Sequence, residues 1–363
     1  MSRIASAALA ALVLQSAWAP GVAAQLPSDS VLHALARERV ESGRSAGVVV
    51  AVLDADGSRR FAGFNHHTHG EGSFDEHTLF EIGSITKAFT GALLAEMASR
   101  GDLALDDPVE ALLPGGVTVP SDGERRITLE DLATHTSGLP RIPSNMRPAS
   151  FLNPYVDYSV EQLYEFLGSH ELRRGVGEAY EYSNLGFGLL GHALALRAGA
   201  SYEDLLRERI LGPLGMDDTG ITLSDDGRAR LAPGHNARGD TVPNWDLPTL
   251  AGAGALRSTA ADMLRFLAAH LRGDDGIGAR IVTATQARRA AGSANMDIGL
   301  GWHILRRPDR TLVWHNGGTG GYRTFAGFDA GRGIAVVVLT NSAVSADDIG
   351  FHLLDPSMSL TAP

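Results

Sequence analysis

The feature that most constrains the fold is the separation of strand-like and helix-like stretches along the chain. A run of β-branched and small apolar residues at 47–53 is followed by a turn and a second extended run at 59–64, which is typical of a β-hairpin. Strand-like runs separated by turns return only near the C-terminus, at 299–305, 311–315, 322–328 and 334–339. Consecutive strands with tight connections favour an antiparallel sheet.

The chain between these two sets of strands has a helical character. Capping patterns such as those at 159–162 and 201–204 open short helices, and long loops containing Pro and Gly separate them. We therefore predict that strands from both ends join one sheet, with helices inserted between them. The predicted fold is α/β of the α+β type: an antiparallel sheet flanked by helices, with a discontinuous sheet domain at 25–105 and 290–363 and an all-helical domain at 106–289.

The composition excludes several classes of protein. With 363 residues, 44% hydrophobic and 20% charged, the chain is globular and long enough to bury a substantial core. The formal net charge of −11, without a basic stripe, argues against nucleic acid as a partner. The absence of cysteine excludes a thiol nucleophile, a disulfide framework and cysteine-ligated zinc.

The first residues have the pattern of a secretory signal peptide. Arg3 precedes an apolar stretch at 4–18, and small residues at 22–24 form a cleavage site, so we predict a signal peptide at 1–24 that is cleaved after Ala24. An uncleaved membrane anchor is disfavoured because the apolar stretch is short and interrupted by polar residues. We expect a periplasmic or secreted protein without a stable membrane span, and a monomer.

A candidate nucleophile stands in Ser84-Ile85-Thr86-Lys87, just before an apolar run with helical periodicity at 88–97. Residues three apart on a helix share a face, so the hydroxyl of Ser84 and the amine of Lys87 can approach each other. The helix N-terminus also offers unpaired N–H groups to a developing negative charge. A serine whose proton is taken by a nearby lysine becomes a nucleophile. The alternative is a plain helix cap at Ser84 beside a solvated Lys87.

Two further stretches contain residues that could act together with a nucleophilic Ser84. Tyr182-Ser183-Asn184 lies at a loop-to-helix junction, where Tyr182 can transfer protons if a nearby cation such as Lys87 lowers its pKa. The alternative is a buried tyrosine whose hydroxyl is satisfied. A glycine-rich stretch at 315–322 ends a strand, where glycines let a substrate approach the backbone closely. A phosphate loop is excluded because no Gly-Lys-Ser/Thr follows, which leaves a plain hairpin turn as the alternative.

Together these stretches resemble the serine β-lactamase and penicillin-binding-protein superfamily, in particular the branch of class C β-lactamases, D-alanyl-D-alanine carboxypeptidases and related esterases. That branch carries S-x-x-K, Y-x-N and K-T-G or H-x-G motifs, which stand here in the same order at 84–87, 182–184 and 315–317. Three further stretches are also similar to the family, at 134–140, 213–216 and 256–263. The resemblance therefore extends from about Gly47 to Ser342, which is nearly the whole mature chain.

The resemblance implies a mechanism and a set of site residues. Ser84 would attack an amide or ester carbonyl and form an acyl-enzyme, with Lys87 and Tyr182 sharing the proton transfers as the other catalytic residues. The backbone N–H groups of Ser84 and Gly318 would form the oxyanion hole. No metal or cofactor is needed. The implied substrate-binding residues are Asn184, which would hold an amide of the substrate, and the strand residues His315, Asn316, Gly317 and Gly318.

One departure from the family pattern bears on the substrate. His315 stands where the best-known β-lactamases of the superfamily have a lysine that helps to hold the substrate carboxylate. Histidine is only partly charged near neutral pH, so we expect a weaker and pH-dependent attraction for a carboxylate. Arg257 or Arg323 would be able to compensate, although a surface position is expected for each.

Several functions remain open at this point. The first is a class C-like β-lactamase, and the alternatives are a D-alanyl-D-alanine carboxypeptidase or endopeptidase and an esterase on small acyl esters. A non-hydrolytic penicillin-binding sensor is disfavoured because no membrane segment or partner domain is recognised. The substrate is accordingly a β-lactam, a D-alanyl peptide or an ester. A loop with His66, His67 and His69 has metal-ligating residues, but histidines in a polar, Gly-flanked loop are more often exposed to solvent.

Overall fold

The computed structural model describes residues 26–66, 74–273, 276–287, 289–293 and 295–361. Its central element is an antiparallel sheet with eight strands. In chain order these are β1 (Gly47–Leu53), β2 (Arg59–Asn65), β5 (Ala290–Ser293), β6 (Met296–Ile298), β7 (His303–Arg306), β8 (Thr311–Gly318), β9 (Arg323–Asp329) and β10 (Ile334–Thr340).

The strand order in this sheet is β2-β1-β10-β9-β8-β7-β6-β5. The N-terminal hairpin of β1 and β2 joins the C-terminal strands because β1 pairs with β10 from Val48 to Leu53. The predicted hairpin and the predicted single sheet built from both ends of the chain are therefore confirmed. A separate two-stranded sheet is formed by β3 (Leu79–Glu81) and β4 (Arg257–Thr259).

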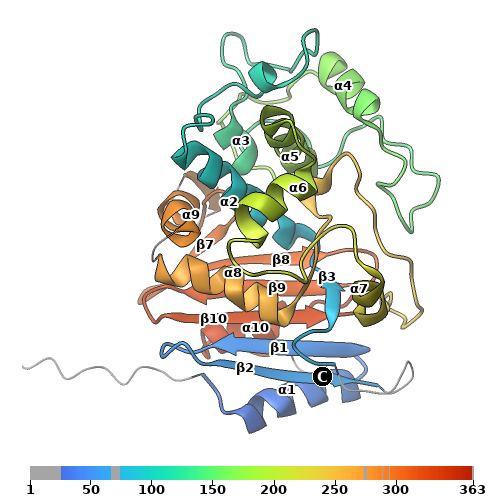
Figure 1. Ribbon diagram of the computed structural model, residues 1–363, viewed down its shortest axis with the longest axis vertical. Helices are drawn as coiled ribbons and strands as arrows, with labels where there is room; N and C mark the ends of the chain where they lie inside the picture. The colour runs from blue at the N-terminus through green and yellow to red at the C-terminus, as the bar shows by residue number, and fades with distance from the viewer. Residues whose placement is uncertain (1–25, 67–73, 274–275, 288, 294, 362–363) are drawn as a thin grey trace, which may run out of the picture.

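Helices cover the sheet and extend beyond it (Figure 1). In chain order the α-helices of the described residues are α1 (Asp29–Glu41), α2 (Thr86–Ser99), α3 (Leu129–Ala133), α4 (Val160–Ser169), α5 (Asn184–Ala198), α6 (Tyr202–Leu206), α7 (Asp225–Arg230), α8 (Ala260–Arg272), α9 (Ile277–Gln286) and α10 (Asp347–Leu354). None of them is long and apolar enough to cross a membrane.

The two faces of the sheet build two apolar cores because successive strand residues point to opposite sides. Val48 and Val50 of β1 belong to a core that contains residues of α1 and α10. Val49 and Leu53 of the same strand belong to a larger core with α8 and α2. Figure 1 shows α8 in front of the sheet and α10 behind it.

The helical part lies above the sheet in Figure 1, around α3, α4, α5 and α6. Helix α2 lies between this part and the sheet, and its residues 86–97 are all buried. The division into a sheet domain and a helical domain at 106–289 remains a prediction. Helix α8 falls inside that range and nevertheless packs against β1, β9 and β10, because its apolar face covers the sheet.

One predicted strand is interrupted in the structure. The run at 299–305 contains a turn, so β6 ends at Ile298 and β7 begins only at His303. Gly301 has a φ angle of 75°, and a Cβ atom there would lie 2.3 Å from the carbonyl oxygen of Lys87. The glycine therefore lets this turn pass close against α2.

Two predictions fall wholly or partly outside the described residues. These are the signal peptide at 1–24, and the loop histidines His67 and His69. The remaining loop histidine, His66, has its Nε2 atom 3.0 Å from the carbonyl oxygen of Val40.

Candidate active site

Ser84 lies in a single turn of 3₁₀ helix, η1 (Gly83–Ile85), that leads directly into α2. The N-cap residue of α2 is Ile85, so the alternative of Ser84 as a plain helix cap is wrong. Lys87 follows in the first turn of α2, and its Nζ atom lies 3.0 Å from the Oγ atom of Ser84. Ser84 is partly exposed, whereas Lys87 is 0% exposed. A substrate can therefore reach the hydroxyl while the amine stays behind it.

The amine of Lys87 has two further partners, the side-chain oxygen of Asn184 at 2.9 Å and the carbonyl oxygen of Ala253 at 2.6 Å. Burial, and to a lesser degree the charge of Arg141, lower the pKa of Lys87 well below its usual value of 10.5. A neutral amine has two N–H bonds, which these two oxygens accept. In that neutral form the lone pair of Lys87 faces the hydroxyl of Ser84, and the amine can accept its proton.

Tyr182 lies next to the same amine, with the Nζ atom of Lys87 4.8 Å from the centre of its ring. Burial raises the pKa of Tyr182 above its usual value, while a hydrogen bond with Ser84 and the charge of Arg141 act in the opposite direction. The condition set for Tyr182, a pKa lowered by a nearby cation such as Lys87, is not met, because burial of the phenol outweighs the contributions that lower its pKa. The phenol therefore keeps its proton near neutral pH and can donate it.

Asn184 is the first residue of α5, and the side chain of Ser183 caps this helix by accepting from the backbone nitrogen of Gly186. The amide group of Asn184 connects two parts of the site. Its oxygen accepts from Lys87, and its nitrogen donates to the hydroxyl of Tyr155 at 3.1 Å. Tyr155 belongs to the long loop after 140 and is itself buried, so the amide links the buried amine to this loop.

The glycine-rich end of β8 lies directly against the Ser84 turn. A Cβ atom on Gly317 would lie 1.9 Å from the carbonyl oxygen of Ile82, and a Cβ atom on Gly83 would lie 2.6 Å from the backbone nitrogen of Gly318. Gly83 also has a φ angle of 51°. Only glycine permits this approach, which places the backbone of Gly318 next to the turn that carries Ser84.

The side chains of His315 and Asn316 point to opposite faces of the sheet, as expected for neighbours on a strand. His315 faces the site, with its ring centre 6.1 Å from that of Tyr182. Asn316 faces the other side, where its side-chain nitrogen donates to Asp347 of α10 at 2.6 Å. The structure therefore brings together all the predicted site residues except the side chain of Asn316.

His315 is buried and uncharged. Its Nδ1 atom lies 2.6 Å from the carbonyl oxygen of Asn316, and its Nε2 atom has no hydrogen-bond partner among the described residues. Burial lowers the pKa of His315 well below 6.5. The expectation of a pH-dependent positive charge at this position near neutral pH is therefore wrong, and His315 presents a lone pair instead.

Arg257 and Arg323 were expected at the surface, where either would be able to attract a substrate carboxylate in place of His315. In the structure both arginines are bound to neighbouring groups. Arg257 is 7% exposed rather than at the surface, and it lies 3.4 Å from Glu81 and 3.3 Å from Asp246. Arg323 is half-buried and donates to the carbonyl oxygens of Thr319 and Tyr322, both at 2.7 Å. Both guanidinium groups thus serve local structure.

Sequence reasoning missed three residues that surround the site. Arg141 is exposed, its guanidinium carbon lies 5.0 Å from the ring centre of Tyr182, and it has no ion-pair partner among the described residues. His303 stacks on His315 at 4.8 Å. His135 packs against Tyr182 at 4.4 Å. The stretch at 134–140 gave a signal for His135, whereas His303 is brought to the site only by the pairing of β7 with β8.

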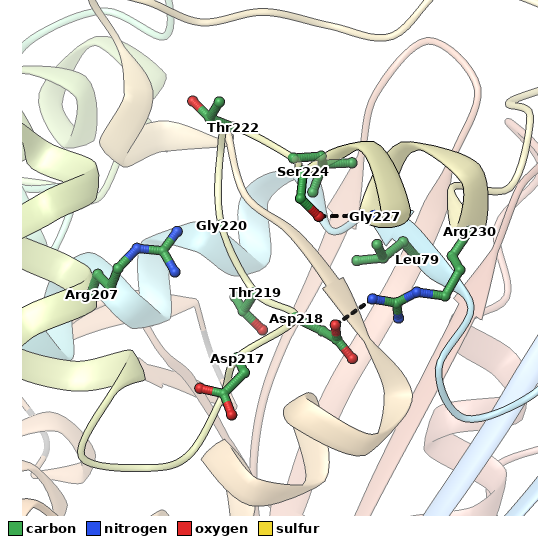
Figure 2. A pocket seen from close by; sticks show the side chains of 11 residues that line it. Leu79, Arg207, Asp217, Asp218, Thr219, Gly220, Thr222, Ser224, Gly227 and Arg230 are labelled. Carbon is green, nitrogen blue, oxygen red and sulfur yellow. Dashed lines mark hydrogen bonds and ion pairs between the residues drawn. The ribbon is translucent and has the colours of Figure 1, made fainter.

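A hollow elsewhere in the molecule shares no residue with this cluster. Figure 2 shows it between the loop at 217–224 and α7, with Arg230 directed toward Asp218. Arg230 also pairs with Asp226, and Arg207 pairs with Glu203, so much of the charge at its border is already neutralised. Within the described residues, no group of three or more His, Asp or Glu side chains is arranged to hold a metal ion.

A buried lysine amine held against an accessible serine hydroxyl, at the border of an antiparallel sheet and a helical layer, defines a class of serine hydrolases. The chain belongs to the beta-lactamase family, whose model, described as Beta-lactamase, matches residues 32–352. Two curated relatives have similar sequences over most of their length. The D-alanyl-D-alanine-carboxypeptidase/endopeptidase AmpH of Escherichia coli (strain K12) is 31% identical, covering 83% of this chain and 81% of the relative. Penicillin-binding protein 4 of Amycolatopsis lactamdurans is 28% identical, covering 86% of each.

Solved structures have the same fold. A class C beta lactamase from Rhodobacter sphaeroides superposes with a TM-score of 0.73 at 27% identity, covering 86% of this chain and 94% of that one. A beta-lactamase/D-alanine carboxypeptidase from Yersinia pestis also has a TM-score of 0.73, at 26% identity, covering 91% and 98%. The protein is therefore a serine hydrolase of the class C β-lactamase and D-alanine carboxypeptidase type, as predicted.

Proposed function

We propose that this enzyme forms an acyl-enzyme on Ser84 and acts first as a class C-like β-lactamase, which opens the β-lactam amide bond. The observation that carries the proposal is the 3.0 Å contact between the buried amine of Lys87 and the accessible hydroxyl of Ser84. A D-alanyl-D-alanine carboxypeptidase or endopeptidase, or an esterase on small acyl esters, would use the same residues. The name of the AmpH relative favours the peptidase alternative.

In the acylation step, Lys87 takes the proton of Ser84 as Oγ attacks the substrate carbonyl and the Oγ–C bond forms. Tyr182 then gives its hydroxyl proton to the leaving nitrogen or oxygen, and Lys87 restores that proton. In deacylation, water attacks the acyl carbon and its proton passes through Tyr182 to Lys87, which returns a proton to Ser84 as Oγ leaves. The coupled groups titrate as one unit.

The negative charge on the carbonyl oxygen needs hydrogen-bond donors at the point of attack. We assign this role to the backbone N–H groups of Ser84 and Gly318, which the close contact at Gly83 holds together. Each such donor is worth about 3 kcal/mol of transition-state stabilisation.

The groups that surround the side chain of Ser84 determine which substrates are recognised. The amide of Asn184 is placed to hold an amide of the acyl group, and β8 from His315 to Gly318 lines the site, with the Asn316 side chain on the opposite face. We assign the attraction of a substrate carboxylate to Arg141 rather than His315, because Arg141 is exposed, charged and 5.0 Å from the ring of Tyr182. Arginine suits this role because its planar fork matches a carboxylate.

The experiment incubates purified protein with benzylpenicillin, a chromogenic cephalosporin and a short-chain nitrophenyl ester, and follows intact mass and product over time. Rapid turnover of the β-lactams supports the β-lactamase function, and a long-lived adduct supports the peptidase. Ester cleavage without any β-lactam adduct supports the esterase. Ser84→Ala should abolish every one of these reactions, and a variant that still turns over substrate contradicts the whole mechanism.

The cellular location is a separate proposal. The charged, apolar and small-residue segments at 1–24 support export and cleavage after Ala24, which gives a periplasmic or secreted enzyme. N-terminal sequencing of the exported protein tests this directly. An N-terminus upstream of the apolar stretch at 4–18 contradicts it.

A further inference from the structure

His135 has an unusual backbone conformation. Its φ angle is 61°, and no other residue except glycine has a positive φ among the described residues. This left-handed conformation is unfavourable for most side chains and persists only where the surrounding structure holds it. His135 follows the end of α3 at Ala133, and its side chain is buried at 3% exposure.

In this conformation His135 forms hydrogen bonds with the backbone on both sides of Tyr182. Its carbonyl oxygen accepts from the backbone nitrogen of Glu181 at 2.8 Å. Its ring atom Nδ1 accepts from the backbone nitrogen of Ser183 at 3.0 Å. The ring of His135 also packs against that of Tyr182, with centres 4.4 Å apart and planes inclined by 32°. One residue thus contacts both flanking peptide groups and the ring.

These contacts fix the state of the imidazole. A backbone N–H can only donate, so Nδ1 must carry a lone pair and the proton must be on Nε2. Burial lowers the pKa of His135 well below 6.5, which keeps this neutral form in place. Gain of a proton on Nδ1 would break the bond to Ser183.

We propose that His135 is a positioning residue that holds the hydroxyl of Tyr182 against Ser84 and Lys87. It does not touch substrate, and it acts by restricting the backbone at 181–183 and the orientation of the tyrosine ring. The proposal rests on the proposed function, in which Tyr182 transfers the proton to the leaving group. Displacement of a reacting group by about 1 Å can cost about a hundredfold in rate.

The test uses substitutions that separate backbone conformation from hydrogen bonding. His135→Gly permits the positive φ but removes the acceptor and the ring. His135→Asn tolerates the positive φ, and its side-chain oxygen can occupy the position of Nδ1. We expect His135→Gly to lose about a hundredfold in kcat with little change in KM, and His135→Asn to recover most of that loss. The probes are a chromogenic cephalosporin and a short-chain nitrophenyl ester.

A double-mutant cycle with Tyr182→Phe shows whether His135 acts through the tyrosine. If it does, His135→Gly has little further effect once the tyrosine hydroxyl is gone. Independent, additive losses of activity in the double mutant contradict the proposal. It is also contradicted if His135→Asn is no more active than His135→Gly while circular dichroism shows that both variants are folded. Failure of the proposed function is distinguishable, because it appears as activity in Ser84→Ala or in Tyr182→Phe alone.

Discussion

Gly83 and Gly318 are in such close contact that a Cβ atom added to Gly83 would lie 2.6 Å from the backbone nitrogen of Gly318. The contact joins the turn before α2 to the end of β8, which come from opposite ends of the chain. In the proposed mechanism this contact sets the spacing of the two backbone donors that stabilise the oxyanion.

Gly83→Ala should therefore impair catalysis more than folding. The added methyl group pushes β8 away from Ser84 and misplaces one donor, and loss of one such donor lowers kcat by about a hundredfold. Steady-state kinetics and thermal unfolding of the same preparation check this. Gly101→Ala is a matched control, because Gly101 also has a positive φ, 77°, but has nothing within 4 Å of an added Cβ. Equal activity of the two variants contradicts the prediction.

The acid side of the activity profile should report the protonation of Lys87. Only its neutral amine can take the proton of Ser84, and burial lowers the pKa of Lys87 well below 10.5. Activity is therefore expected to fall as the pH drops through that lowered pKa and to be full above it. The measurement is kcat/KM against pH for a substrate without ionisable groups.

Lys87→Arg provides the matched substitution for this prediction. Arginine keeps the positive charge but cannot lose its proton in the usual pH range, so loss of the base should lower kcat by about a thousandfold at every pH. An active arginine variant with an unchanged profile would show that Lys87 acts only through its charge.

The sequence predicted the parts of the site that short motifs encode. The order of Ser84, Tyr182 and the strand at 315–317 was sufficient for the family, and the strand-like runs at both ends of the chain were sufficient for the sheet. The motifs could not show which side chains of β8 face the site, and Asn316 faces α10 instead. A strand places neighbours on opposite faces, but which face is inward depends on the packing of the whole sheet.

Burial was the second property that the sequence could not supply. The prediction for Tyr182 assumed a charged lysine beside it, and the one for His315 assumed access to water. Both assumptions failed because Lys87 and His315 are enclosed by residues from distant parts of the chain, at 0% and 1% exposure. Desolvation then outweighs the local sequence in setting the charge of each group.

The buried histidines should make the protein less stable in acid. Burial lowers the pKa of His303 from 6.5 to about 4. Between these values the unfolded chain binds a proton that the folded protein does not, so stability is full above 6.5 and falls as the pH drops toward 4. His303 alone contributes about 3 kcal/mol of this loss.

Denaturant unfolding across this pH range tests that contribution. His303→Gln should flatten the fall in unfolding free energy, because the variant has no group at 303 that gains a proton on unfolding. His33→Gln, at an exposed position on α1, is the control and should leave the slope as it is. Identical slopes for wild type and His303→Gln contradict the assignment.

Arg141 should decide how strongly the enzyme prefers negatively charged substrates. Arg141→Gln removes the exposed charge beside Tyr182, while the carbonyl oxygen of residue 141 can still accept from the backbone nitrogens of Asn184 and Leu185. We expect kcat/KM for benzylpenicillin to fall about tenfold, which is the effect of one lost hydrogen bond to a charged group. The methyl ester of the same penicillin, which lacks the carboxylate, should be little affected.

The comparison of the acid with its ester separates recognition of charge from general damage to the site. Arg147→Gln is the matched control, because Arg147 is exposed on the same loop and donates only to the nearby carbonyl oxygens of Ser144 and Met146 among the described residues. Salt should weaken binding of the acid by wild type and by Arg147→Gln, but less by Arg141→Gln. If Arg141→Gln slows the acid and the ester equally, the carboxylate is held elsewhere.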